Sequence, residues 1–244
     1  NVYRVVKIGN RQWLADDLRT KSFIYKGDTI KLDDVKIKGK FSPKPYKTIT
    51  LSESGSTGIV YCSGYSQSVG GYAVEFNNRE GRQLWSMPSY IEQLAPKGFH
   101  ISNNDDWEDL ERYYRIDTPK IVYLYYYPFE LVSEGNYDII RDENPDCFQG
   151  SDVQLRRLLS SKYDWKYYNN EETAVGMQTQ FNAKPFAGEG YGCIYYTMSR
   201  NLRGLGLFRI LSTMDKGILN LGCYSVDGDY LYQYQYVSLR CVKD

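Results

Sequence analysis

Histidine is almost absent from this chain of 244 residues, because His100 is the only one. A single histidine excludes metal sites built from several histidines, and any histidine-dependent catalytic triad would have to use His100. An excess of charge of one sign is also missing, since 30 Lys and Arg balance 30 Asp and Glu. The chain therefore lacks the basic field on which affinity for nucleic acid depends, and we predict no nucleic-acid partner.

Long apolar runs are missing as well. The most apolar stretch, residues 121–132, is interrupted by tyrosines, Pro128 and Glu130 and is too short to cross a membrane. We therefore predict no transmembrane segment. No secretory signal is present in this chain.

Cysteine is present in an odd number and in no metal-binding pattern. Neither CxxC nor another zinc spacing occurs, and at least one thiol has no partner within the chain. The five cysteines are Cys62, Cys147, Cys193, Cys223 and Cys241.

Tyrosine is the abundant aromatic, with 25 residues against 9 Phe and 4 Trp. Two explanations stay open: amphipathic rings on half-buried strands, or a surface that stacks on sugars or on partner side chains. The alternating tyrosines of residues 230–236 are typical of strand packing. We predict the ligand-binding surface at Tyr123, Tyr125, Tyr126 and Tyr127.

Three segments have helix signals. Residues 87–94 carry Pro88 in a first helical turn, and residues 151–159 combine a capping-box pattern with leucines on one side. The clearest helix begins after Asn103, a favoured N-cap, with Asp106 at the third helical position. Its predicted core-facing stripe consists of Trp107, Leu110, Tyr113 and Tyr114.

The remaining elements are predicted strands. Gly9-Asn10 is a turn between two strand-like runs, and residues 21–58 form a surface excursion with at most short strands. From Gly190 onward, successive strands predict an antiparallel meander, with a hairpin turn at residues 227–229. The fold class is therefore α+β, with two or three helices packed on an antiparallel sheet and with long loops.

Candidate sites for chemistry are few. The acidic cluster of residues 105–111 is best interpreted as a solvated helix face. The sequence has no EF-hand loop and no phosphate-binding loop that opens a helix, so we expect no cofactor, with a structural calcium as the alternative. His100 is open to three roles: a structural ring that donates to a backbone carbonyl, a base without a nominated nucleophile, or a ligand contact.

Three segments carry a family resemblance. They are residues 6–20, residues 96–110 and residues 237–244, which include Gln12-Trp13-Leu14-Ala15-Asp16-Asp17-Leu18, Gly98-Phe99-His100 and Leu239-Arg240-Cys241. In that order they resemble the Fibrobacter succinogenes major paralogous domain, a family of secreted and surface-attached bacterial domains common in Bacteroidetes. The resemblance implies a C-type-lectin-like fold, one domain over residues 1–244, and an insertion around residues 115–152.

This chain departs from the family pattern at particular positions. Ala95 stands where the family has the cysteine that is a plausible disulfide partner for Cys241, so Cys241 is either buried and inert or paired with another cysteine. Ser102 replaces a family proline, and Ile210-Leu211 stand where a tryptophan is usual. We predict structural roles for four residues: His100, Asn103, Trp107 and Cys241.

The resemblance implies a location and a task. We expect an extracellular or outer-surface protein, exported with a signal peptide that is not part of this chain and in some cases lipid-anchored. The expected function is non-enzymatic recognition of a glycan or a protein. The alternative is a structural or assembly component of a bacterial surface or fimbrial complex. Enzymes with the broader lectin-like fold use a reactive cysteine pair or a metal, for which this sequence offers no pattern.

Overall fold

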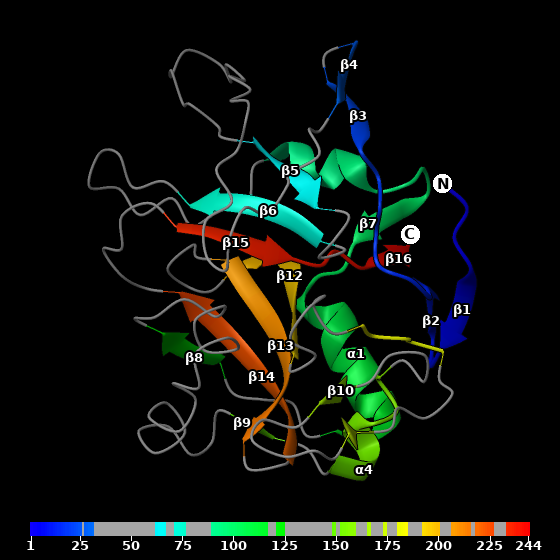
Figure 1. Ribbon diagram of the computed structural model, residues 1–244. Coiled ribbons are helices and arrows are strands. Elements are labelled where there is room, and N and C mark those ends of the chain that lie inside the picture. Colours follow the sequence, from blue (N-terminus) through cyan, green and yellow to red (C-terminus); the bar gives the residue numbers. More distant parts are fainter. Residues whose placement is uncertain are drawn as a thin grey trace.

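Strands dominate the described part of the chain, and α1 (Asn104–Tyr114) is the longest of its helices (Figure 1). The computed structural model describes residues 1–25, 27–31, 62–66, 71–76, 89–116, 121–124, 148–149, 152–159, 165–166, 173–174, 180–184, 192–200, 206–215, 218–226 and 233–244. Nearly all strand pairs are antiparallel, so the predicted α+β class is confirmed at this level.

The first sheet combines segments from the start, the middle and the end of the chain. Its strand order is β1 (Val5–Ile8), β2 (Arg11–Leu14), β16 (Cys241–Lys243) and β7 (Phe99–Ile101). All three pairings are antiparallel. Gly9, with φ of 59°, lies in the turn between β1 and β2, which confirms the predicted hairpin. The two ends of the chain are thus neighbours in one sheet.

The largest sheet is built on a three-stranded meander. It consists of β12 (Gly192–Arg200), β13 (Gly206–Asp215) and β14 (Ile218–Val226), which pair antiparallel as predicted. On β14, β8 (Ile121–Leu124) adds in parallel and β9 (Phe148–Gln149) adds antiparallel. Parts of the segment that we expect to be an insertion therefore pair with the main sheet.

The strand after the meander does not continue it. β15 (Gln233–Val237) pairs with β6 (Gly71–Phe76), which in turn pairs with β5 (Cys62–Ser66). The predicted hairpin at residues 227–229 is therefore wrong, because the strands on either side of it belong to different sheets; the turn residues themselves lie outside the described residues. Two small pairs remain, β3 (Ser22–Tyr25) with β4 (Asp28–Lys31) and β10 (Trp165–Lys166) with β11 (Thr173–Ala174).

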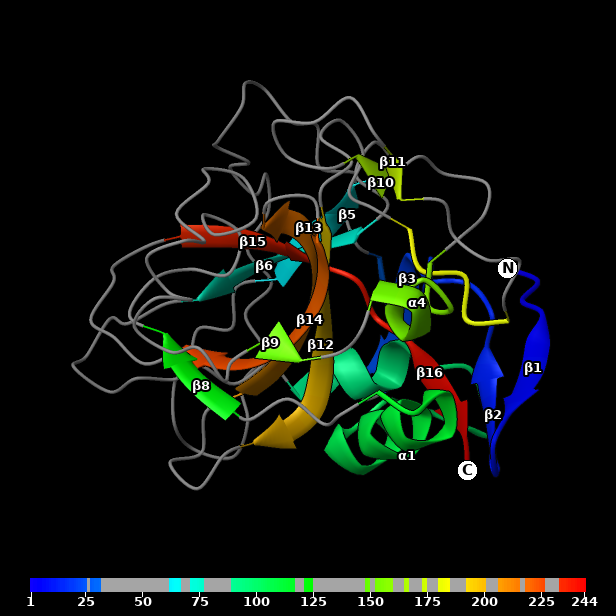
Figure 2. The same cartoon turned by 90° about the horizontal axis from the view of Figure 1, so that it is seen from below.

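Helix α1 (Asn104–Tyr114) begins at the predicted position, and most of its predicted core-facing residues are buried. Asn103 is its N-cap, and Asn103 and Asp106 form a complete capping box. The predicted core-facing position is wrong for Tyr113. Its side chain is 52% exposed, and its ring lies over Gly9 at the surface. Figures 1 and 2 both show α1 between the first sheet and the β12–β14 strands.

The other two predicted helices are shorter than expected. The segment near residues 87–94 is the 3-10 helix η1 (Ser89–Leu94), and the third is one turn, α4 (Asp152–Leu155). The leucines at 155, 158 and 159 are nevertheless buried as their spacing predicts, since turns continue after α4.

An aromatic cluster joins the first sheet, α1 and the largest sheet. Trp13 on β2 and Trp107 on α1 pack edge to face with their centroids 6.0 Å apart. Phe181 contacts both, and Tyr195 on β12 lies 5.2 Å from Trp107. All four side chains are fully buried, so the expected structural role of Trp107 agrees with its position in the core.

Arg240 lies inside this core and is itself fully buried. Its Nη1 donates to the main-chain oxygens of Leu14 (3.2 Å) and Phe181 (2.5 Å), and its Nη2 donates to Asp17 Oδ1 (2.5 Å) and Tyr195 Oη (3.2 Å). The guanidinium also lies 4.3 Å from the centroid of the Phe181 ring. Burial by itself would lower the pKa of Arg240, but the charge of Asp17 and the bonds to Tyr195 and Asp17 raise it above its usual value.

A second buried ion pair connects α1 to the largest sheet. Arg209 Nε on β13 donates to Glu111 Oε1 at 2.8 Å, and Arg209 Nη2 donates to Asn104 Oδ1 at 2.9 Å. The interpretation of residues 105–111 as a solvated face is therefore wrong for two members, because Asp106 and Glu111 are fully buried and paired with cations. Asp105 is exposed as expected.

The buried Asp17–Arg240 pair yields the first prediction. Asp17→Asn would leave the guanidinium of Arg240 without its counter-charge in the core, and we expect it to lower the free energy of unfolding by about 3–5 kcal/mol. The neighbouring Asp16, whose ion pair with Arg4 at 3.5 Å is partly exposed, provides the matched control. Asp16→Asn should cost about 1 kcal/mol or less. Urea unfolding of both variants measures the difference, and equal losses would contradict the prediction.

Candidate functional site

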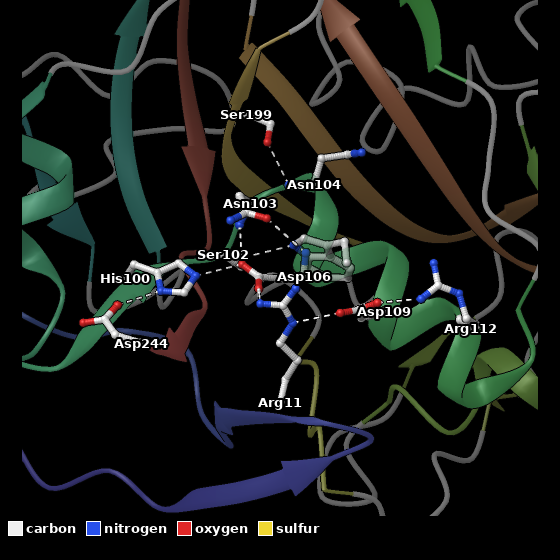
Figure 3. Close-up of polar contacts among 11 residues, drawn as sticks. Arg11, His100, Ser102, Asn103, Asn104, Asp106, Asp109, Arg112, Ser199 and Asp244 are labelled. Carbon is white, nitrogen blue, oxygen red and sulfur yellow. Dashed lines mark hydrogen bonds and ion pairs between the residues drawn. The ribbon is translucent and has the colours of Figure 1, made fainter.

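His100 bridges the start of α1 and the last residue of the chain (Figure 3). Its Nε2 lies 2.9 Å from Asp106 Oδ2, and its Nδ1 lies 2.9 Å from Asp244 Oδ1. The ring is 35% exposed, while Asp106 is fully buried and Asp244 is 60% exposed. His100 thus ties β7 to α1 as a structural histidine would, but the expected backbone-carbonyl acceptor is wrong: both acceptors are carboxylates.

Asp106 is the central group of this site. Its Oδ2 accepts the main-chain N–H of Asn103 at 2.9 Å, and its own N–H donates to Asn103 Oδ1 at 3.0 Å. Arg11 Nη1 lies 2.8 Å from Asp106 Oδ1, an ion pair without the alignment of a hydrogen bond. The positive end of the helix dipole adds to these contacts. Together they explain why a carboxylate is accommodated with no exposed surface.

Arg11 extends the site along the outer face of α1. Its Nε donates to Asp109 Oδ2 at 2.9 Å, and Arg112 Nη1 donates to Asp109 Oδ1 at 2.6 Å. The hydrogen bond from Arg11 is the largest cause that lowers the pKa of Asp109, with a further bond from Arg112 acting in the same direction. No sequence signal predicts a role for Arg11, although it lies in the first of the family-like segments.

The segment between His100 and the helix has its own polar contacts (Figure 3). Ser102 Oγ accepts the indole N–H of Trp107 at 3.1 Å, and Ser199 Oγ accepts the main-chain N–H of Asn104 at 2.8 Å. Ser102 N–H also donates to the main-chain oxygen of Arg240 at 2.7 Å. A proline at position 102 would lack both the N–H and the hydroxyl. The departure from the family pattern at Ser102 therefore has a structural reason.

The chemistry that this arrangement supports is charge pairing. A histidine that activates a nucleophile needs one ring nitrogen in contact with a hydroxyl or a thiol. Here both nitrogens of His100 face carboxylates, and the nearby hydroxyl of Ser102 is engaged by Trp107. Within the ranges described, no group of three or more His, Cys, Asp and Glu side chains is arranged to hold a metal ion. The helices of the described part are also too short or too polar to cross a membrane.

Comparison with protein-family models, with curated proteins and with solved structures gave no match. The resemblance to the Fibrobacter succinogenes major paralogous domain therefore stays a prediction from the sequence.

The described thiols are buried. Cys193 and Cys241 form no disulfide, which favours the first of the two alternatives for Cys241. Burial raises the pKa of Cys241 to about 12, and it raises the pKa of Cys193 further, assisted by the charge of Asp17. Cys62 and Cys223 lie on strands whose side chains are not described at these positions, and Cys147 lies outside the described residues.

The predicted ligand-binding tyrosines are only partly placed. Tyr123 is the third residue of β8, opposite Ser225 of β14. Tyr125, Tyr126 and Tyr127 follow directly in the sequence and lie outside the described residues.

The residues that sequence reasoning missed are the partners of buried charges. A signal was available for Arg240, because it is flanked by Leu239, Cys241 and Val242 in a segment that predicts a buried strand. Such a cation requires an anion nearby, and Asp17 in the first family-like segment was a reasonable candidate. Asp244 had no comparable signal.

Burial of the two thiols leads to the second prediction. A thiol with a pKa of about 12 has very little thiolate at pH 8, and thiolate is the reactive form. We expect alkylation of Cys193 and Cys241 to be at least about a hundredfold slower in the native protein than in urea. Peptide mapping by mass spectrometry measures each site separately. If Cys241 stayed unlabelled in urea without a reductant, it would be paired and the prediction would be wrong.

Proposed function

We propose that this chain is a non-enzymatic recognition module, displayed outside the cell, that binds a glycan or a protein. The proposal includes membership of the Fibrobacter succinogenes major paralogous domain family and a C-type-lectin-like fold over residues 1–244. Residues 115–152 are proposed as an insertion that carries the binding surface.

The arrangement of the first sheet supports the family proposal. The three family-like segments are separated by 75 residues (21–95) and 126 residues (111–236) in the sequence, yet they supply nearly all of the four strands of this sheet, together with the first part of α1. Segments that share one sheet are expected to share their sequence constraints, because each strand fixes the register of the next. A secreted or surface location follows from the family and not from any residue of the site.

The observation that carries the binding proposal is the position of the tyrosine run. Among the described strands, β8 is the terminal member of the largest sheet's strand order, and it pairs with β14 only. Tyr123 lies on this edge strand, and Tyr125, Tyr126 and Tyr127 come next in the sequence. Tyrosine offers a large contact area, a polar hydroxyl and little side-chain entropy to lose, which suits contact with sugars or protein surfaces.

The third prediction tests this surface. A glycan-array screen of the purified chain, run with calcium and again with EDTA, should give specific binding that survives EDTA. Tyr125→Ala and Tyr127→Ala should each weaken that binding about tenfold or more, because buried aromatic contacts dominate recognition surfaces. Circular dichroism spectra of both variants should match that of the unsubstituted chain, which would show that the fold is unchanged.

Tyr113→Ala is the matched control, since Tyr113 is an exposed tyrosine that lies on α1. It should leave binding unchanged. Equal weakening by Tyr113→Ala and Tyr125→Ala would contradict the proposed location, and loss of binding in EDTA would contradict a metal-free mode.

A specific observation also favours the alternative, an assembly component. Ile24 on β3 is 68% exposed, whereas its neighbour Phe23 is buried. Within the described residues β3 pairs with β4 only, so this two-stranded sheet presents an apolar residue beside an open edge. Open edges with exposed apolar side chains are favourable sites for association with another chain.

The fourth prediction separates the two functions. If the chain assembles through β3, Ile24→Ser should reduce self-association, measured by light scattering after size-exclusion chromatography, by about fivefold or more. Val5→Ser is the control, because Val5 is an apolar residue on β1 that is 49% exposed. A wild-type chain that stays monomeric up to high concentration and does not co-purify with surface proteins would count against assembly.

A further inference from the structure

We infer that His100 is a pH-sensitive latch. The doubly protonated ring fastens Asp244 to the start of α1, and loss of one proton releases Asp244 while the contact with Asp106 persists. This latch is independent of the proposed binding function, because it involves neither β8 nor the tyrosine run.

The first step of the argument is the pairing of donors and acceptors. Both nitrogens of His100 lie 2.9 Å from carboxylate oxygens. An ionised carboxylate only accepts hydrogen bonds, whereas a neutral imidazole has one N–H donor and one bare nitrogen. Both contacts are therefore satisfied together when each ring nitrogen carries a proton. With a neutral ring, one nitrogen lone pair would face a negative oxygen.

The second step is that the two carboxylates differ in how firmly they are held. Asp106 is fully buried, accepts the N–H of Asn103 and is paired with Arg11. Moving it would disrupt the cap of α1 and leave a buried charge without partners. Asp244 is 60% exposed, so water can replace the ring as its partner at little cost. The neutral ring should therefore keep its proton on Nε2, toward Asp106.

The third step concerns the other groups around the ring. From β2, the cation of Arg11 balances the charge of Asp106, so Asp106 can stay ionised after the ring becomes neutral. On β16, the residue opposite His100 is the apolar Val242. The main chain of Asp244 remains attached through its N–H bond to Gly98 O at 3.1 Å. Opening is thus a movement of the Asp244 side chain, and the Nδ1 proton passes to water.

The sign of the pH dependence follows from this geometry. The contact between His100 and Asp244 contributes to stability while the ring is doubly protonated and Asp244 is ionised. The contribution is lost as the pH rises and the ring becomes neutral. At high pH the surface near the start of α1 carries the unpaired charge of Asp244.

The fifth prediction uses the fact that the chain has one histidine, so labelled ring nitrogens give signals from His100 alone. In nitrogen-15 NMR of the full chain from pH 5 to pH 9, both ring nitrogens should be protonated at low pH. At high pH the proton should remain on Nε2, and the Asp244 signals should change with the same midpoint as the ring. A neutral ring protonated on Nδ1, or Asp244 signals that do not follow the ring, would overturn the inference.

Three substitutions test the latch without relying on the assignment of NMR signals. Asp244→Asn should raise the unfolding equilibrium constant about twofold to fivefold at pH 5 and leave it nearly unchanged at pH 9, as expected for a partly exposed ion pair. Asp105→Asn removes an exposed acid of the same helix turn that does not contact His100, and it should show no such difference between the two pH values. In a His100→Gln background the pH dependence of the Asp244→Asn effect should vanish; if it persisted, the latch would be ruled out.

Discussion

The interaction on which the rest of the structure depends is the buried ion pair of Arg240 and Asp17. A guanidinium in the core is costly unless its charge and its N–H groups are matched, and here a carboxylate, a phenol and two main-chain oxygens surround it. These partners come from the end of β2, from the segment around Phe181 and from β12. Because each contact requires its segment at a fixed distance, one side chain near the end of the chain determines how the first sheet faces the largest one.

The start of α1 is positioned by the same strand. The main-chain oxygen of Arg240 accepts the N–H of Ser102, and the oxygen of Ser102 accepts the N–H of Met198 on β12. Asn103 then caps the helix, so the capping box is placed by tertiary hydrogen bonds on its N-terminal side. Asp106 consequently reaches both His100 and Arg11. The site is therefore continuous with the core, and the packing of the core strands positions its charged side chains.

The sequence predicted elements whose signals are local and missed features that depend on distant partners. The N-cap of α1, the Gly9 turn and the β12–β14 meander all have local signals, and all are confirmed. The helical spacing of α1 is confirmed except at Tyr113. Glu111 appears in the sequence as one acid among several, and in the structure its buried carboxylate pairs with Arg209, 98 residues away. The pairing of β15 with β6 is similarly non-local. The local turn signal at residues 227–229 predicts a hairpin instead and contains no information about β6.

The charge pairing around α1 also constrains where recognition can occur. A ligand that engaged His100, Arg11 or Asp109 would have to displace an existing partner, and removing Arg11 or His100 would take away one of the contacts that compensate the buried charge of Asp106. Such a cost would oppose binding at this face. The ionic contacts near the two ends of the chain therefore serve to hold the fold, because each of these side chains already has a partner of opposite charge. The recognition surface proposed at the tyrosine run lies in a different part of the sequence.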